Sequence, residues 1–155
     1  MKVALQRELL ASLEATLQAL ARAHADAREG ATHAEARPEN DKDTRALEAS
    51  YLARGQAMRV AALEAALAAV RTMPLPVGGE GVPAALGALI EAREGPTRLR
   101  FFLAPEGGGL RLADGVQVVT PRSPLGQALV GKRVGDEVEV TLAGRTRVLS
   151  LTRVQ

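Results

Sequence analysis

The feature that most constrains the fold is a pair of long helix-forming segments separated by a short polar stretch. In the first segment, apolar residues recur seven apart or alternate three and four apart, and they are Val3, Leu10, Leu13, Leu17 and Leu20. This spacing places the apolar side chains on one stripe of a helix, as in a coiled coil. The stripe predicts a helix from about Val3 to Arg28, which Gly30 is expected to end.

A second helix is predicted from Asp43 to Met73, followed by Pro74 and Pro76, which cannot continue a helix. Its apolar residues at roughly helical spacing are Leu47, Tyr51, Leu52, Met58, Leu63, Leu67 and Val70. Two helices of similar length joined by a polar segment predict an antiparallel hairpin. Each arm of roughly 27–31 residues would span about 40–46 Å. An arm of that length is expected to act as a probe or lever within a larger assembly.

The composition favours long helices with a small second domain rather than one large hydrophobic core. Of the 155 residues, 46% are hydrophobic but only 2% are aromatic, namely Tyr51, Phe101 and Phe102. The absence of cysteine excludes disulfides and thiol chemistry. No signal peptide or transmembrane run is evident, so we expect a cytoplasmic protein without a membrane partner. The net charge of +2 and the lack of a Lys/Arg block argue against a dedicated nucleic-acid arm.

The hydrophobic period changes from helix to strand after a Pro/Gly-rich stretch. We expect residues 1–74 to form the hairpin with its tip at about 30–43, residues 75–83 a linker, and residues 84–155 a β-rich domain. Strands are predicted at 88–93, 98–103, 116–120, 137–142 and 145–152. Ser123 as N-cap and Pro124 at the first helical position predict one short helix. The predicted fold class is α+β, with an antiparallel helical hairpin followed by a small antiparallel sheet domain.

Residues 123–140, SPLGQALVGKRVGDEVEV, resemble the C-terminal hallmark of the Gre family of bacterial transcript-cleavage factors. The shared pattern is Ser-Pro, a small residue, Ala-Leu, a hydrophobic residue, Gly, then Gly-Asp and a strand. The resemblance implies an FKBP-like domain that binds RNA polymerase at the rim of its secondary channel. The partner-binding residues that it implies are Ser123, Pro124, Leu125, Gly126, Lys132, Arg133, Gly135 and Asp136.

In that family the coiled coil enters the channel, and acidic residues at its tip help hold a second Mg²⁺ for cleavage of backtracked RNA. Mg²⁺ prefers carboxylate and water oxygens, and a second metal stabilises the attacking and leaving oxygens. By this resemblance the tip carboxylates are, in order of preference, Glu39 with Asp43, then Asp41, then Glu48. The Mg²⁺ would be shared with the polymerase, so the chain would have no cofactor of its own and would be an accessory factor and no enzyme. The resemblance also implies a monomer and a possible contact with backtracked RNA.

The tip also departs from the family pattern, which reads approximately Asp-Leu-x-Glu-Asn followed by an acidic-aromatic pair. Glu39-Asn40 match, but Ala36 stands where the Asp is expected, and no aromatic residue accompanies Asp43. One alternative is therefore a regulator of the same architecture that occupies the channel without stimulating cleavage. Asp41 and Asp43 also fit helix capping, because carboxylates at a helix start accept backbone N–H bonds.

Other functions leave features of the sequence unexplained. An FKBP-like domain suggests a prolyl isomerase, but Phe101 and Phe102 are too few aromatics for its pocket. As neighbours on one strand they face opposite sides, so one of them could be exposed. His24 and His33 have no cysteine partner for zinc; His24 continues the apolar stripe, and His33 is expected in a loop. A generic coiled-coil module leaves the motif at residues 123–140 without a role.

Overall fold

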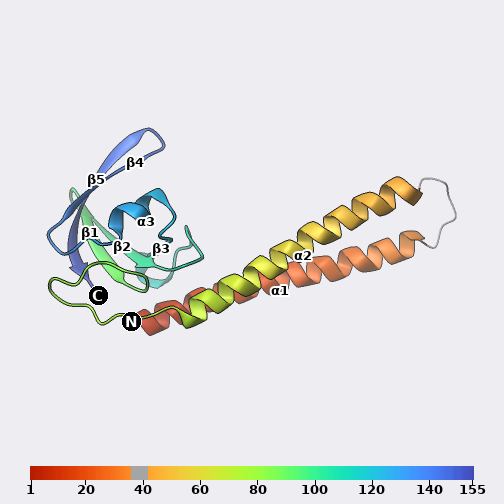
Figure 1. The fold of residues 1–155 in the computed structure, drawn as a ribbon, viewed down its shortest axis with the longest axis horizontal. Coiled ribbons are helices and arrows are strands. Elements are labelled where there is room, and N and C mark those ends of the chain that lie inside the picture. The colour runs from red at the N-terminus through yellow and green to blue at the C-terminus, as the bar shows by residue number, and fades with distance from the viewer. Residues whose placement is uncertain (36–41) are drawn as a thin grey trace. The chain divides into compact units, whose positions relative to one another are not determined.

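The computed structural model describes the backbone of residues 1–35 and 42–155, and the side chains of residues 1–29, 44 and 46–155. Its helices are α1 (Lys2–Glu35), α2 (Lys42–Thr72) and α3 (Pro124–Leu129), with a 3₁₀ turn at Ala113–Gly115. Its strands are β1 (Leu89–Glu94), β2 (Thr97–Leu103), β3 (Gln117–Val119), β4 (Glu137–Leu142) and β5 (Arg145–Val154), shown in Figure 1. The predicted α+β fold class is confirmed. The chain divides into two compact units, one of residues 12–67 and one of residues 1–11 with 68–155.

In the unit of residues 12–67, α1 and α2 run antiparallel (Figure 1). Ring nitrogen Nδ1 of His24 lies 2.7 Å from Oε1 of Gln56, so His24 joins the two helices by a hydrogen bond at the predicted stripe position. The apolar contacts predicted for the first half of α2 are wrong, because these side chains are 56–73% exposed: Leu47, Tyr51, Leu52 and Met58. At 100° per residue, Leu47, Tyr51 and Met58 fall on the side of α2 opposite Gln56.

Helix α1 does not end at Gly30 as predicted but continues to Glu35. A glycine inside a helix costs only about 1 kcal/mol relative to alanine. The residues after it, Ala-Thr-His-Ala-Glu, include strong helix formers that carry the helix on. His33, predicted in a loop, is therefore part of α1.

At the start of α1 the buried stripe differs from the predicted one. Val3 is 51% exposed, whereas Leu5 and Leu9 are buried and Leu13 continues them at a spacing of four. The reason lies in the surroundings, because this part of α1 packs within the same unit as the β-rich segment. A Cβ on Gly107 would stand 2.6 Å from Cδ1 of Leu9, so that loop comes into direct contact with the helix.

The sheet has the order β3-β2-β1-β5-β4 in the described chain. Strands β1–β2, β1–β5 and β4–β5 pair antiparallel, as predicted, but β2 and β3 pair parallel. The expectation of a wholly antiparallel sheet is therefore wrong at this edge. The long connection between β2 and β3 reverses the chain before β3, where Arg111 and Gln117 form an isolated antiparallel bridge, so β3 returns in the direction of β2.

Both faces of the sheet bury apolar residues near β2. Phe101 lies on one face, in the core formed with Leu129 of α3 and Leu151 of β5. Phe102 lies on the other face, next to Leu89 and Val118, its cross-strand partners. Phe101 and Phe102 are 2% and 0% exposed, so the suggestion that one of the rings could be exposed is wrong.

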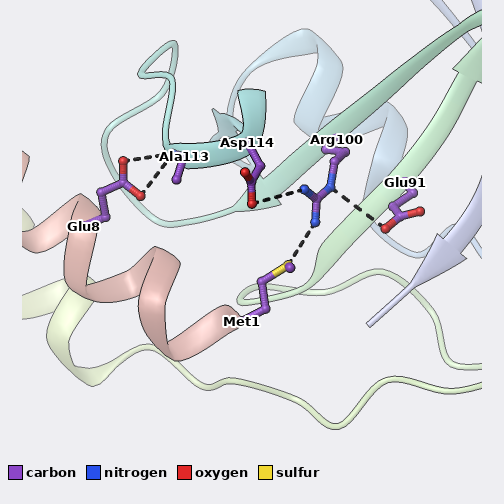
Figure 2. A network of polar contacts seen from close by, with 6 residues as sticks. All are labelled: Met1, Glu8, Glu91, Arg100, Ala113 and Asp114. Atoms are coloured by element: carbon purple, nitrogen blue, oxygen red, sulfur yellow. Dashed lines mark hydrogen bonds and ion pairs between the residues drawn. The ribbon is translucent and has the colours of Figure 1, made fainter.

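Polar contacts hold the start of α1 to the β-rich segment of the same unit (Figure 2). The backbone N–H of Ala113 donates to the Glu8 carboxylate at 2.9 and 3.1 Å. Arg100 donates to the Met1 sulfur at 2.9 Å and lies 3.9 Å from both Glu91 and Asp114. Arg100 and Phe102 lie on the same face of β2, so α1 reaches the face that buries Phe102.

An ion pair between Glu94 and Arg147 ties the end of β1 to β5. Hydrogen bonding from Arg147 lowers the pKa of Glu94 from its ordinary value of 4.5. A lowered folded-state pKa adds stability that is present above pH 4.5 and is lost as the pH falls through the folded-state value. We expect Glu94→Gln to lower the Tm by a few degrees at most at pH 7, since both side chains are partly exposed.

Thermal melts of the parent and Glu94→Gln across pH 3–7 check this prediction. The difference in Tm should shrink as the pH falls below about 4.5, because protonation then removes the same charge from the parent. A difference that stays constant across this range would show that the glutamate charge has no part in the contact.

Candidate functional site

The motif at residues 123–136 begins as a capped helix. Ser123 Oγ accepts a hydrogen bond from the backbone N–H of Gly126 at 3.0 Å and donates to the carbonyl of Thr120 at 2.8 Å. Pro124 occupies the first turn of α3, where its missing N–H costs nothing. Leu125 is buried in the core of the sheet domain. The Ser-Pro-Leu residue types are thus explained by local folding.

Gly126 is the position where α3 comes closest to the preceding turn. A Cβ at this position would stand 1.8 Å from the carbonyl oxygen of Thr120. No side chain fits at that distance, so only glycine lets α3 lie directly against the Thr120 backbone. This close approach fixes where the rest of the motif is presented.

The turn after α3 is held by backbone hydrogen bonds to Ala84 and by a hydrogen bond within the turn. Gly131 N–H donates to the Ala84 carbonyl, and Ala84 N–H donates to the Lys132 carbonyl, each at 2.7 Å. The Asp136 carboxylate accepts from the Arg133 backbone N–H at 2.8 Å. Gly135 has a φ of 92°, which favours glycine. The Gly-Asp pair therefore serves the turn itself, which leaves its neighbours free to face outward.

The predicted partner-binding residues divide by exposure. Leu125 and Gly126 are buried, Ser123 and Lys132 are half-buried, and the exposed ones are Pro124, Arg133, Gly135 and Asp136. The structure adds two residues that the sequence analysis did not select, Val130 and Val134, which are 42% and 43% exposed. Their exposure could have been predicted from their position beside the Gly-Lys-Arg turn, because a turn between a helix and a strand often leaves apolar side chains exposed. We call Val130, Arg133 and Val134 the turn surface.

Two other basic residues of the β-rich unit, Arg122 and Arg147, form ion pairs. Arg122 Nη2 lies 2.7 Å from Glu106 Oε1, and Arg147 pairs with Glu94. Arg133 is exposed and its side chain forms no hydrogen bond or ion pair with another described residue. Its guanidinium is therefore available to a partner.

The tip carboxylates fall mostly outside the described residues. Glu39 and Asp41 lie outside them. Asp43 belongs to the first turn of α2, but its side chain is also outside the described set. Glu48 is exposed on α2. Among the described residues, no group of three or more His, Cys, Asp or Glu is placed to hold a metal ion. The assignment of Glu39 and Asp43 as Mg²⁺ ligands therefore stays a prediction.

Residues 112–155 match the family model described as transcription elongation factor, GreA/GreB, C-terminal. The match contains α3, the turn surface, β4 and β5. No curated protein sequence is significantly similar to the chain. Among the described residues, no helix is long and apolar enough to span a membrane.

The chain is similar to solved structures at low sequence identity. Gfh1 of Thermus aquaticus is 19% identical, with 96% of this chain and 95% of that chain covered and a TM-score of 0.43. Gfh1 of Thermus thermophilus is 18% identical over 94% of each chain, with a TM-score of 0.42. A GreA/GreB elongation factor of Nitrosomonas europaea is 18% identical over 45% of this chain and 58% of that one, with a TM-score of 0.36.

Proposed function

We propose that this chain binds RNA polymerase through its C-terminal domain. Residues 112–155 of that domain match the GreA/GreB C-terminal family of transcription elongation factors. The observation that carries the proposal is the motif within the match. Its buried residues and glycines build a helix and a turn held by hydrogen bonds, and its exposed residues Val130, Arg133 and Val134 form a small apolar and basic surface. A surface held by such contacts suits docking, because little conformational freedom is lost on binding.

In this proposal the two antiparallel helices enter the secondary channel of the polymerase from the cytoplasmic solution. The connection between Glu35 and Lys42 then faces the active site, together with Glu39, Asp41 and Asp43. Carboxylates at this point would complete the coordination of a second Mg²⁺ that activates water against backtracked RNA. Because Mg²⁺ is usually held by one or two protein carboxylates together with other ligands, the ion would be shared with the polymerase, and the chain would act as its accessory factor.

A second candidate function follows from the tip sequence. Ala36 occupies the place of the expected aspartate, and no aromatic residue accompanies Asp43. With one carboxylate fewer, the chain would occupy the channel and regulate the polymerase without stimulating cleavage. Both candidates require polymerase binding and differ only in whether the RNA is shortened.

Prolyl isomerase activity is disfavoured by burial of the aromatic residues. Phe101 and Phe102 are the aromatic side chains of residues 68–155, and both are at most 2% exposed. Neither ring lines an open pocket for a proline substrate, whereas binding sites for such ligands are lined by accessible apolar side chains.

The docking proposal is tested by reversing the charge of its basic residues. Lys132→Glu with Arg133→Glu should weaken binding to core RNA polymerase by roughly tenfold at low salt, with a smaller loss at 0.5 M salt, since exposed charges are screened. Fluorescence anisotropy of the labelled protein against purified core enzyme measures the affinity.

Arg133→Glu alone should weaken binding less than the double variant does. Its matched control is Arg7→Glu, which reverses one exposed charge on the side of α1 away from Leu5 and Leu9. The control should bind as the parent does. Equal affinities for the parent and the Lys132/Arg133 double variant at low salt would place the docking surface elsewhere on the chain.

A further inference from the structure

Two arginines face each other directly across the β1–β2 pair. Arg93 on β1 is the register partner of Arg98 on β2, and both side chains are exposed. Like charges in this position destabilise a sheet, because the Cβ atoms of cross-strand partners lie about 5 Å apart. Neither side chain forms a hydrogen bond or ion pair with another described residue. The fold therefore bears a local repulsion that nothing in the described chain relieves.

The other arginines of this sheet face have partners. Arg100, one pair further along β2, lies beside Glu91 and Asp114 and touches Met1 (Figure 2). Arg153 is the cross-strand partner of Glu91. Arg93 and Arg98 thus stand apart as a pair without counter-charge, at the end of the sheet face away from Leu89 and Phe102.

Glu91 is the nearest acidic residue on the same face, about 7 Å along β1 from Arg93, but it lies 3.9 Å from Arg100, and the other acidic residues are further away. Ser150 of β5 lies between Arg93 and Glu137, being the register partner of both. Glu137 is therefore two strand spacings, about 10 Å, from Arg93. Glu139 follows two residues along β4, opposite Val148. The face is basic over β1–β2 and acidic at β4, which gives a partner a defined orientation.

The chemistry of the pair favours carboxylates of a protein over RNA. Guanidinium groups bind carboxylates and phosphates by paired hydrogen bonds. Proteins that bind single-stranded RNA add exposed aromatic side chains on which bases stack. Residues 68–155 offer none, because Phe101 and Phe102 are both buried. An acidic protein surface needs only the guanidinium pair and supplies the missing counter-charge.

We propose that Arg93 and Arg98 form a second docking surface, which binds an acidic patch on RNA polymerase and is separate from the turn surface. This inference rests on the proposed function, since it names a further contact with the same partner. Binding would bring carboxylates between the two guanidiniums and remove their repulsion. The pair therefore lowers the stability of the free domain in exchange for affinity in the complex.

The test uses Arg98→Gln and Arg98→Glu in the full chain, with Arg7→Glu as the control for charge reversal. Arg98→Glu should weaken binding to core polymerase about fivefold or more at low salt, and Arg98→Gln by less. The Tm of Arg98→Glu should equal or exceed that of the parent, because the introduced carboxylate would pair with Arg93. Weaker binding by a protein of equal or higher stability cannot be attributed to misfolding.

Each other outcome overturns a defined claim. If the parent binds polymerase and Arg98→Glu binds equally well, the second surface is wrong while the proposed function stands. If Arg98→Glu loses affinity for a labelled single-stranded RNA but not for the polymerase, the pair binds RNA instead. If the parent itself fails to bind polymerase, the proposed function fails, and the inference fails with it.

Discussion

Replacing Gly126 by alanine is expected to destabilise the β-rich unit by about 3 kcal/mol, although alanine is the better helix former by about 1 kcal/mol. The added Cβ would stand 1.8 Å from the Thr120 carbonyl oxygen, and the atoms that it meets belong to the backbone. To accommodate it, α3 must move away from the turn. That movement disturbs the hydrogen bonds of Ser123 with Thr120 and Gly126 and the burial of Leu125.

Thermal unfolding measures this effect, with an expected fall in Tm of roughly 15 °C for a unit of this size. The control is Gln127→Ala, which changes the exposed neighbour of Gly126 on the same helix and should alter stability by less than about 0.5 kcal/mol. A Tm of Gly126→Ala within two degrees of the parent would mean that the Thr120 turn yields at little cost, and that Gly126 has no packing reason to be glycine.

Removing the tip carboxylates with Glu39→Ala and Asp43→Ala is expected to reduce stimulated RNA cleavage by about 100-fold or more. An effect of this size is typical when groups that hold a catalytic metal are lost. Binding to the polymerase should remain within about twofold of the parent, because the docking surfaces are elsewhere in the chain. Cleavage of RNA in backtracked complexes, followed on a sequencing gel, gives the rate. The double variant Asp26→Ala with Glu64→Ala removes two exposed acids from the same helices and should cleave as the parent does.

A structural role for Asp43 in the first turn of α2 is distinguished by Asp43→Asn. Asparagine keeps a side-chain oxygen that can accept a hydrogen bond from a backbone N–H group but lacks the negative charge that Mg²⁺ binding requires. Loss of cleavage in Asp43→Asn supports a metal ligand, whereas cleavage equal to the parent, with a loss only in Asp43→Ala, supports the structural role. Cleavage by the Glu39/Asp43 double alanine variant at the parent rate would rule out the carboxylate mechanism.

The elements with strong local signals could be predicted from the sequence. Ser123 and Pro124 specify the start of α3, and alternation with an Ala-Gly turn specifies β4 and β5. Features that depend on distant contacts could not. The parallel pairing of β3 with β2 depends on the path of the intervening loop, and the burial of Phe102 depends on segments that come together only in the fold.

The same limit applies to the candidate site. The sequence pattern at residues 123–136 located the motif. The structure is needed to show that the Asp136 carboxylate bonds within its own turn and that Val130 and Val134 are exposed. The repulsion between Arg93 and Arg98 depends on strand register, which the sequence leaves open. The exposure of Tyr51 and Met58 could not be predicted, because alanines are spread around α2 and more than one face of the helix could pack against α1.

The most direct test of the central claim is to add the purified chain to backtracked RNA polymerase complexes with Mg²⁺ and to resolve the RNA on a gel while following co-elution of the chain. We expect the chain to co-elute with the polymerase, and the RNA to be shortened from its 3′ end only when the chain is present. Co-elution without shortening would select the channel-occupying regulator and remove the cleavage role from Glu39 and Asp43. Absence of both co-elution and shortening would contradict the claim that this chain acts on RNA polymerase.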